Sequence, residues 1–242
     1  MKVLLTHNYY QHTGGEDRSY ADERKMLRDR GHEVVEYNRS NEEIKQINRA
    51  LLAGQTIWNR KTYRELRQLI QAEKPDLMHC TNTFPLISPA AYSAARSLGV
   101  PVVQSLRNYR LLCPSAVFMR EGKVCQSCMG KTFATPAIQH GCYRESRAAS
   151  AVVAAMLAWH KLRGTWQKDV DVFFTPTEFA REKYIEGGFP ADRILVKPNC
   201  VDPDPGIGDG SGGYAVFVGR LAQEKGIETL LSAWRRLGDS IP

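Results

Sequence analysis

Two short loops carry residue types that suit a diphosphate. Gly14 and Gly15 precede a predicted helix, and because glycine lacks a side chain, an anion could approach the backbone and meet the amides of the first helical turn. Arg220 and Lys225 stand five positions apart in a second loop before a helix, where a guanidinium and an ammonium could hold phosphate oxygens. From spacing alone, a plain turn and a solvated basic turn are equally good interpretations. The G-x-G-x-x-G pattern is absent, which counts against an NAD enzyme.

Four of the six cysteines gather in one irregular stretch, 106–146, which we interpret as an insertion. Its inner pair has the C-x-x-C spacing with which two thiolates bind one tetrahedral ion, and His140 is a fifth candidate ligand. The spacing therefore predicts a structural metal site, with zinc as the expected ion. Reduced cysteines packed as small apolar groups are the alternative, and a redox pair is a weaker one. The four candidate ligands are Cys113, Cys125, Cys128 and Cys142.

Short β-prone runs alternate with helical patterns along most of the chain. Ser40 and Glu43 have the spacing of a capping box, and Gly31 and Gly99 supply helix stops. Alternation at this density predicts a parallel, doubly wound α/β sheet. The expected strands are 3–5, 32–37, 76–80, 100–103, 171–174 and 194–196, and the expected helices are 19–30, 44–52, 63–70, 90–98, 148–162 and 177–187.

The regular alternation ends near Pro198. Residues 1–198 are expected to form one complete domain, and the glycines and prolines of 199–213 predict a linker. Residues 214–242 begin a second unit with a strand at 214–218 and a helix at 227–237. One strand and one helix cannot bury a core, so we expect the opening of a truncated second domain.

Composition and charge exclude several classes of protein. With 242 residues, 43% hydrophobic and 24% charged, the chain is typical of a globular protein. The longest nearly uncharged apolar run, 148–159, is too short to span a bilayer, and no signal-peptide core is present, so we expect a cytoplasmic protein. The net charge of +7 suits phosphates or an anionic membrane face. Packing of 148–159 in the core is the simpler interpretation. The alternative is that this run lies on an anionic membrane surface, held there by the flanking cations Arg144, Arg147, Lys161 and Arg163.

Polar residues follow the predicted strands where a parallel sheet binds its ligands, beyond the carboxyl ends. His79 and Asn82 come at the end of the third strand, and Arg107 and Asn108 follow the fourth. We expect these side chains to line a pocket. A lone His79 is more often a structural histidine, but its position at a strand end favours the pocket.

Five strings, in order along the chain, together resemble the large retaining glycosyltransferases of family 4. The resemblance covers essentially the whole chain. It implies a GT-B architecture, in which two Rossmann-like domains face each other across a cleft, the first holding the acceptor and the second the nucleotide-sugar. The strings are Gly-Gly-Glu at 14–16, Asp-Leu-Met-His at 76–79 with Asn-Thr-Phe-Pro at 82–85, Asn-Tyr-Arg-Leu-Leu-Cys-Pro at 108–114, Lys-Pro-Asn-Cys-Val-Asp at 197–202, and Val-Gly-Arg-Leu at 218–221 with Glu-Lys-Gly at 224–226.

The resemblance also implies roles for individual residues. Gly15, with Gly14, matches the glycine whose amide approaches the donor diphosphate, and Arg220 and Lys225 match the cations that clamp it. Such groups stabilise the charge that develops on the leaving diphosphate without a metal ion, so no catalytic cofactor is expected. The acceptor pocket is expected to include His12, His79, Asn82, Arg107, Asn108 and Glu178.

The chain departs from the family pattern at two positions. Arg107 and Thr81 stand where relatives commonly have histidine, so we assign no catalytic residue. In relatives, the acidic pair that holds the donor sugar and ribose lies farther along the second domain than this sequence extends, and we expect the fragment to be inactive alone.

The sequence hypothesis is therefore a glycosyltransferase. It would move a sugar from a nucleotide-diphosphate sugar to a polysaccharide, lipid-linked or small-molecule acceptor, with peripheral contact at the inner membrane face. One alternative hypothesis is a non-catalytic binding module that is stabilised by a structural metal and was left after loss of the donor domain. The other, a nucleic-acid-binding protein that uses the cysteine knuckle, is weakened because aromatic residues do not interleave with the basic ones.

Overall fold

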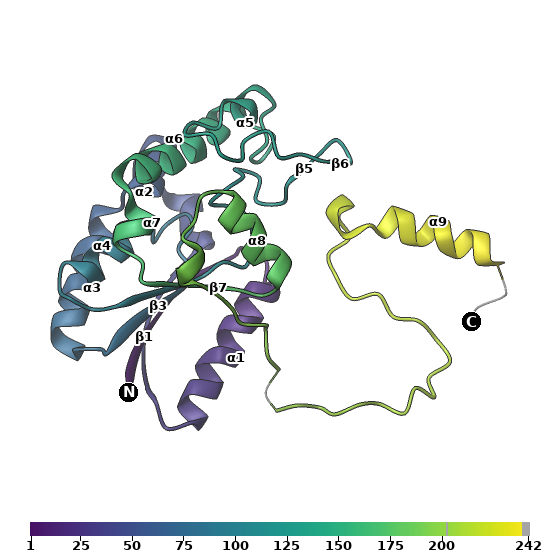
Figure 1. The fold of residues 1–242 in the computed structure, drawn as a ribbon, viewed down its shortest axis with the longest axis horizontal. Coiled ribbons are helices and arrows are strands. Elements are labelled where there is room, and N and C mark those ends of the chain that lie inside the picture. Colours follow the sequence, from purple (N-terminus) through teal and green to yellow (C-terminus); the bar gives the residue numbers. More distant parts are fainter. Residues whose placement is uncertain (202, 239–242) are drawn as a thin grey trace.

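A computed structural model describes residues 1–201 and 203–238, and its centre is a six-stranded sheet (Figure 1). The strand order is β2-β1-β3-β4-β7-β8, and every neighbouring pair is parallel. The predicted parallel, doubly wound α/β sheet is confirmed. The strands are β1 Lys2–Tyr9, β2 Glu33–Ser40, β3 Leu77–Asn82, β4 Val102–Ser105, β7 Val172–Thr175 and β8 Ile194–Val196.

Helices pack on both faces of this sheet because successive side chains of a strand point to opposite sides. In β1, Val3 and Leu5 pack with Tyr20 of α1. Leu4, between them, packs with Leu66 of α3 in the main core, which α4, α6 and α8 also enter. The helices are α1 Gly15–Asp29, α2 Arg49–Ile57, α3 Arg60–Glu73, α4 Ala90–Arg96, α6 Arg147–Arg163, α7 Thr165–Lys168 and α8 Glu178–Glu186.

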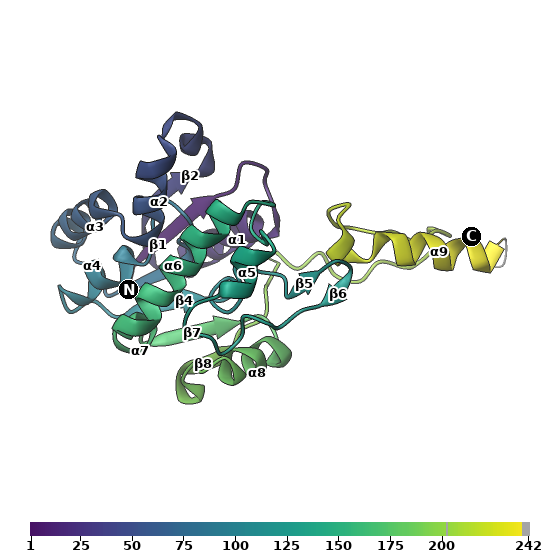
Figure 2. The same ribbon diagram turned by 90° about the horizontal axis from the view of Figure 1, so that it is seen from above.

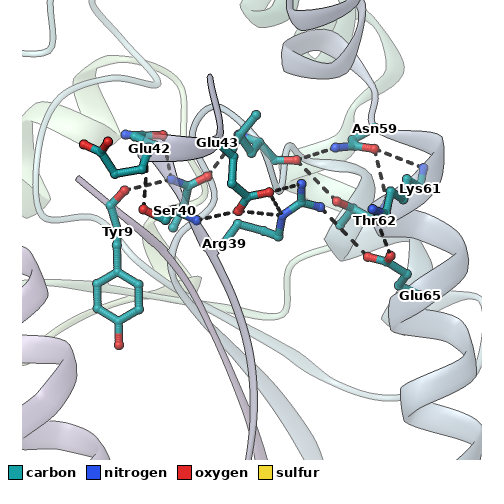
Figure 3. Close-up of polar contacts among 12 residues, drawn as sticks. Tyr9, Arg39, Ser40, Glu42, Glu43, Asn59, Lys61, Thr62 and Glu65 are labelled. Atoms are coloured by element: carbon teal, nitrogen blue, oxygen red, sulfur yellow. Dashed lines mark hydrogen bonds and ion pairs between the residues drawn. The ribbon is translucent and has the colours of Figure 1, made fainter. Parts of the chain in front are cut away.

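Two caps divide the helical region between β2 and β3. The predicted capping box is present: Ser40 Oγ accepts from the Glu42 amide, and Glu43 Oε1 accepts from the Ser40 amide, at the start of the short 3-10 helix η1, Asn41–Gln46 (Figure 3). Asn59, which the sequence did not single out, begins α3 by accepting from the amides of the next turn. With Asn48, which begins α2 by accepting from the Ala50 amide, these two caps account for the three helices of the region.

The stretch 106–146 consists mainly of turns, with a small hairpin and one short helix. The hairpin joins β5, Met119–Arg120, to β6, Lys123–Val124, and the helix is α5, Thr135–Gln139. Ala137 of α5 packs with Ala154 of α6, which attaches the stretch to the main unit.

The C-terminal stretch lies apart from the sheet (Figure 2). The predicted helix at 227–237 is confirmed as α9, Ile227–Leu237, and is preceded by the 3-10 turn η3, Gln223–Lys225. The predicted strand at 214–218 is wrong: these residues are exposed and form no strand. A strand needs a neighbour to fill its backbone hydrogen bonds, and this segment has none. Asp202 and residues 239–242 of the sequence predictions lie outside the described residues.

In the described part of the chain, no helix combines the length and apolar character that crossing a bilayer requires.

Candidate functional site at the carboxyl edge of the sheet

The first turn of α1 leaves space around its two glycines. The Gly14 amide donates to Asp17 Oδ2 at 3.0 Å, which caps the helix start. A Cβ built at Gly14 or Gly15 would have no heavy atom within 4 Å, so nothing inside the protein requires glycine by crowding. The Cβ side of both glycines is therefore unoccupied by protein atoms, and the role of this turn in diphosphate binding stays a prediction.

The end of β4 is tied to this turn. Asn108 Nδ2 donates to Glu16 Oε1 at 2.7 Å, and the Tyr10 hydroxyl donates to Glu16 Oε2 at 2.8 Å. Tyr184 of α8 also donates to the Asn108 carbonyl at 2.5 Å. The loops after β1 and β4 therefore form one polar surface, with the Asn108 side chain at its centre.

A buried histidine, which the sequence analysis missed, supports the same turn. His7 Nε2 lies 2.8 Å from Asp17 Oδ1, its Nδ1 lies 2.7 Å from Thr81 Oγ1, and its ring stacks on Tyr20. Burial lowers the pKa of His7, and because the Asp17 carboxylate can only accept, Nε2 is the ring nitrogen that donates to it. The predicted first strand ended at residue 5, which left His7 in the loop, whereas β1 continues to Tyr9.

Arg107 and Lys197 share one carboxylate. Arg107 Nη2 lies 2.8 Å from Glu23 Oε2, and Lys197 Nζ bonds the other carboxylate oxygen. The Arg107 and Glu23 side chains are only 8% and 5% exposed. Burial alone would raise the pKa of Glu23, but positive charge at His79, which protonates only in acid, and at Arg107 and Lys197 outweighs burial, so the pKa of Glu23 is lowered. Two cations against one carboxylate leave a net positive charge.

His79 adds no charge to this cluster at neutral pH. Burial lowers its pKa from 6.5 to about 4, and the positive charges of Lys197 and Arg107 act in the same direction. Its Nε2 lies 2.9 Å from Ser105 Oγ. The ring also meets Phe174 edge-on. His79 is therefore a neutral, packed side chain beneath the cationic pair.

A small hollow, open to solvent, lies where β4, β7 and β8 end. It is polar, and it places residues from three strand ends around one space. Its lining consists of Ser105, Arg107, Phe174, Thr175, Pro176, Lys197 and Asn199.

The other predicted acceptor residues occupy different surroundings. Asn82 is buried and holds the chain locally, donating to the Asn8 carbonyl at 2.7 Å and accepting from the Phe84 amide at 3.1 Å. His12 is exposed in the loop after β1. Glu178 is exposed at the start of α8, with Arg181 2.7 Å away. Arg107 thus contacts Glu23, which lies near His79, and Asn108 contacts Glu16, whereas the three residues of this paragraph have other contacts.

Arg220 and Lys225 lie in the exposed C-terminal stretch. Arg220 pairs with Glu224 at 2.9 Å, and Lys225 ends η3. No described contact joins either cation to Gly14 or Gly15, and Figure 2 shows their segment apart from the sheet.

The four clustered cysteines line one small cavity, yet they are not grouped as the predicted metal site requires. Among the described residues, no group of three or more His, Cys, Asp or Glu side chains could hold a metal ion. Two of the thiols are engaged locally, Cys113 with Ser115 at 3.2 Å and Cys125 with Ser127 at 3.4 Å. The spacing correctly brought Cys113, Cys125, Cys128 and Cys142 to one cavity, but the ligand grouping is absent, and His140 does not line it.

The apolar run 148–159 forms most of α6 and packs inward, so its simpler interpretation is confirmed. Val153, Met156 and Leu157 are buried in the main core. Exposed apolar surface remains at the end of the helix, where Trp159 is 48% and Leu162 is 75% exposed.

Comparison with known proteins decides the family. The model of the glycosyl transferase 4-like domain matches residues 14–200, most of the sheet unit. The chain belongs to the glycosyl transferase 4-like family. This match includes both glycines of α1, the end of β4 and the cysteine-rich stretch.

Individual relatives of this glycosyl transferase 4-like chain are distant. An uncharacterised 42.6 kDa protein in the cps region of Klebsiella pneumoniae is 26% identical over 178 residues, 71% of this chain and 40% of that protein. The S. aureus MnaA structure with UDP is 16% identical, with a TM-score of 0.45, over 82% of this chain and 44% of that one. UDP-GlcNAc 2-epimerase from Neisseria meningitidis bound to UDP-GlcNAc is 13% identical, with a TM-score of 0.44, over 82% and 46%. The chain spans less than half the length of each of these proteins.

Proposed function

We propose that this chain is the acceptor-side part of a retaining glycosyltransferase, which moves a sugar from a nucleoside diphosphate to a polysaccharide, lipid-linked or small-molecule acceptor. The family match over residues 14–200 carries the proposal. The open first turn of α1, joined to the end of β4 through Glu16 and Asn108, supports it, since a nucleotide-sugar needs such an edge.

In the proposed reaction, negative charge develops on the diphosphate as its bond to the sugar breaks. The amides of the α1 first turn would stabilise that charge, because they are fixed and point toward an approaching anion. Glu16 and Asp17 lie in the same turn, and their negative charges oppose a diphosphate. Cations are therefore needed, and we assign that role to Arg220 and Lys225 in a second domain that would close over the edge.

Binding of UDP to the 242-residue chain, measured by isothermal titration calorimetry, tests the proposal. Gly15→Ala places a methyl group where the diphosphate should lie and meets no internal atom. We expect it to weaken binding about ten-fold, which corresponds to ~1.4 kcal/mol. Gly54→Ala is the matched control, because its added Cβ also meets no atom and lies in α2. The proposal fails if the chain does not bind UDP at millimolar concentration, or if both variants bind as the parent does.

We also propose that the enzyme works in the cytoplasm, in contact with the inner membrane face. All six cysteines are free, which suits a reducing compartment. Because most of α6 packs inward, the proposed membrane contact is confined to the exposed side chains of Trp159 and Leu162. Arg163 lies beside them, with its guanidinium carbon 5.8 Å from the Trp159 ring centroid. Sedimentation with phosphatidylglycerol vesicles should carry the protein down, and Leu162→Glu should abolish this. Equal binding of the variant would contradict the contact.

A structural zinc forms no part of the proposed function, because the described residues contain no group that could ligate it.

A further inference from the structure

Two residues that line the hollow at the ends of β4, β7 and β8 carry polar atoms that the fold leaves unpaired. Arg107 Nη1 and Thr175 Oγ1 are buried and have no hydrogen-bond partner among the described residues. Both residues line the hollow. A buried donor without a partner costs free energy that a bound acceptor would recover.

The charge in the hollow suits an anion. Arg107 presents a second amino group beyond the one that bonds Glu23, and its side chain is only 8% exposed. Lys197 lies on the same wall, a third exposed to solvent. Glu23 neutralises one of these two positive charges, so one positive charge remains for a ligand. A buried guanidinium with a free edge is well suited to bind the oxygens of a phosphate or a carboxylate.

We propose that this hollow, formed by Arg107, Thr175 and Lys197, binds an oxyanion group, a phosphate or a carboxylate, carried by the acceptor. The assignment to the acceptor rests on the proposed function. All three residues belong to the sheet unit, which is the acceptor side of that proposal.

The hollow and the predicted donor site face different parts of α1. The donor diphosphate would lie at Gly14 and Gly15, at the start of α1, whereas the carboxylate that anchors Arg107 and Lys197 belongs to Glu23, eight residues beyond Gly15 on the same helix. At 1.5 Å per residue, Gly15 and Glu23 are about 12 Å apart along the helix axis.

The test is a titration of the 242-residue chain with inorganic phosphate at constant ionic strength, followed by ¹⁵N nuclear magnetic resonance that includes the arginine Nε–H signals. Phosphate should shift the Arg107 signal and the amides of residues 105–107 and 175. Arg107→Gln should weaken phosphate binding at least about ten-fold, and Lys197→Gln and Thr175→Val about three-fold each.

Thr175→Val should not destabilise the fold, because it removes a buried hydroxyl that has no partner among the described residues. Weaker phosphate binding by this variant is therefore not a result of misfolding. The control is Arg96→Gln, which breaks an arginine–carboxylate pair with Asp171, 3.3 Å apart, next to the amino end of β7. It should bind phosphate as the parent chain does. No shift at Arg107, or equal phosphate affinity in the parent, Arg107→Gln and Thr175→Val chains, would overturn the anion site.

A second titration, with the chain saturated by UDP, separates the two sources of the anion. If phosphate still shifts Arg107, the hollow is free for the acceptor, as proposed. If UDP displaces phosphate from Arg107, the hollow serves the donor, and the acceptor assignment is overturned. A chain that binds phosphate at Arg107 but never binds UDP keeps the anion site and loses the proposed function, so the two failures are distinguishable.

Discussion

The sheet unit and the C-terminal stretch contain similar local patterns, but the sheet unit buries its apolar residues and the stretch does not. In the sheet unit, each strand pairs with a neighbour and Phe173 is fully buried. Among residues 203–238, none is buried, and the strand-prone segment 214–218 stays irregular. Helix α9 forms in both the sequence prediction and the structure, because a helix fills its hydrogen bonds within itself. A strand needs a partner, so its formation depends on the rest of the fold.

The largest expected effect comes from removing one aromatic ring in each region. Phe173→Ala should lower the free energy of unfolding by about 3–5 kcal/mol, because it leaves a cavity between β7 and the main core. Phe217→Ala, in the C-terminal stretch, should change it by less than about 0.5 kcal/mol, because that ring is 39% exposed. Urea unfolding followed by circular dichroism measures both. Similar losses in the two variants would remove the distinction between the regions.

The second expected effect is that the sheet unit loses stability in acid, because its strand β3 contains the buried His79. The folded state holds His79 neutral, with its pKa lowered to about 4, whereas the unfolded chain takes up the proton near pH 6.5. Protons therefore bind the unfolded state preferentially, and stability falls as the pH drops below 6.5. Between pH 7 and pH 5 the contribution of this one histidine is about 2 kcal/mol.

Urea titrations at pH 7, 6 and 5 would measure this loss. His79→Gln should remove about 2 kcal/mol of it, while His12→Gln, at an exposed position, should keep the parent's slope. Buried His7 and His160 shift in the same direction and leave a residual slope. If His79→Gln loses stability with pH as steeply as the parent, the ring is not held neutral.

The smallest effect is expected from deleting the C-terminal stretch. A chain that ends at Val201 should unfold with a free energy within about 0.5 kcal/mol of the full chain, because residues 203–238 bury nothing. Scanning calorimetry would report this as a melting temperature shift of about 2 °C or less. A drop of 5 °C or more would show that the stretch contributes to the stability of the sheet unit.

The fold was largely predictable, because alternating apolar runs and caps are local signals. The same signals placed the end of β1 too early. His7 and Asn8 are buried in the strand and hydrogen-bond Thr81 and Asn41, and buried polar residues give no hydrophobic pattern in the sequence.

The site was predictable only in part. Arg107 and Asn108 were found because they follow a strand. Glu23, 84 residues from Arg107, was not, because nothing in a helical sequence says which side chain reaches across to a distant loop. Cysteine spacing predicted a structural metal site; the four cysteines do line one cavity, but no group of three or more described His, Cys, Asp or Glu side chains could hold a metal ion.

The central claim is that the first turn of α1, at the carboxyl edge of the sheet, contacts the diphosphate of a nucleotide-sugar, and the most direct measurement is an amide resonance titration with UDP-glucose. The account predicts that the largest shifts occur at Gly14, Gly15, Glu16 and Asn108, with little change in the hairpin 119–124. Shifts confined to that hairpin or to the amino edge of the sheet, or no shifts at millimolar ligand, would contradict it.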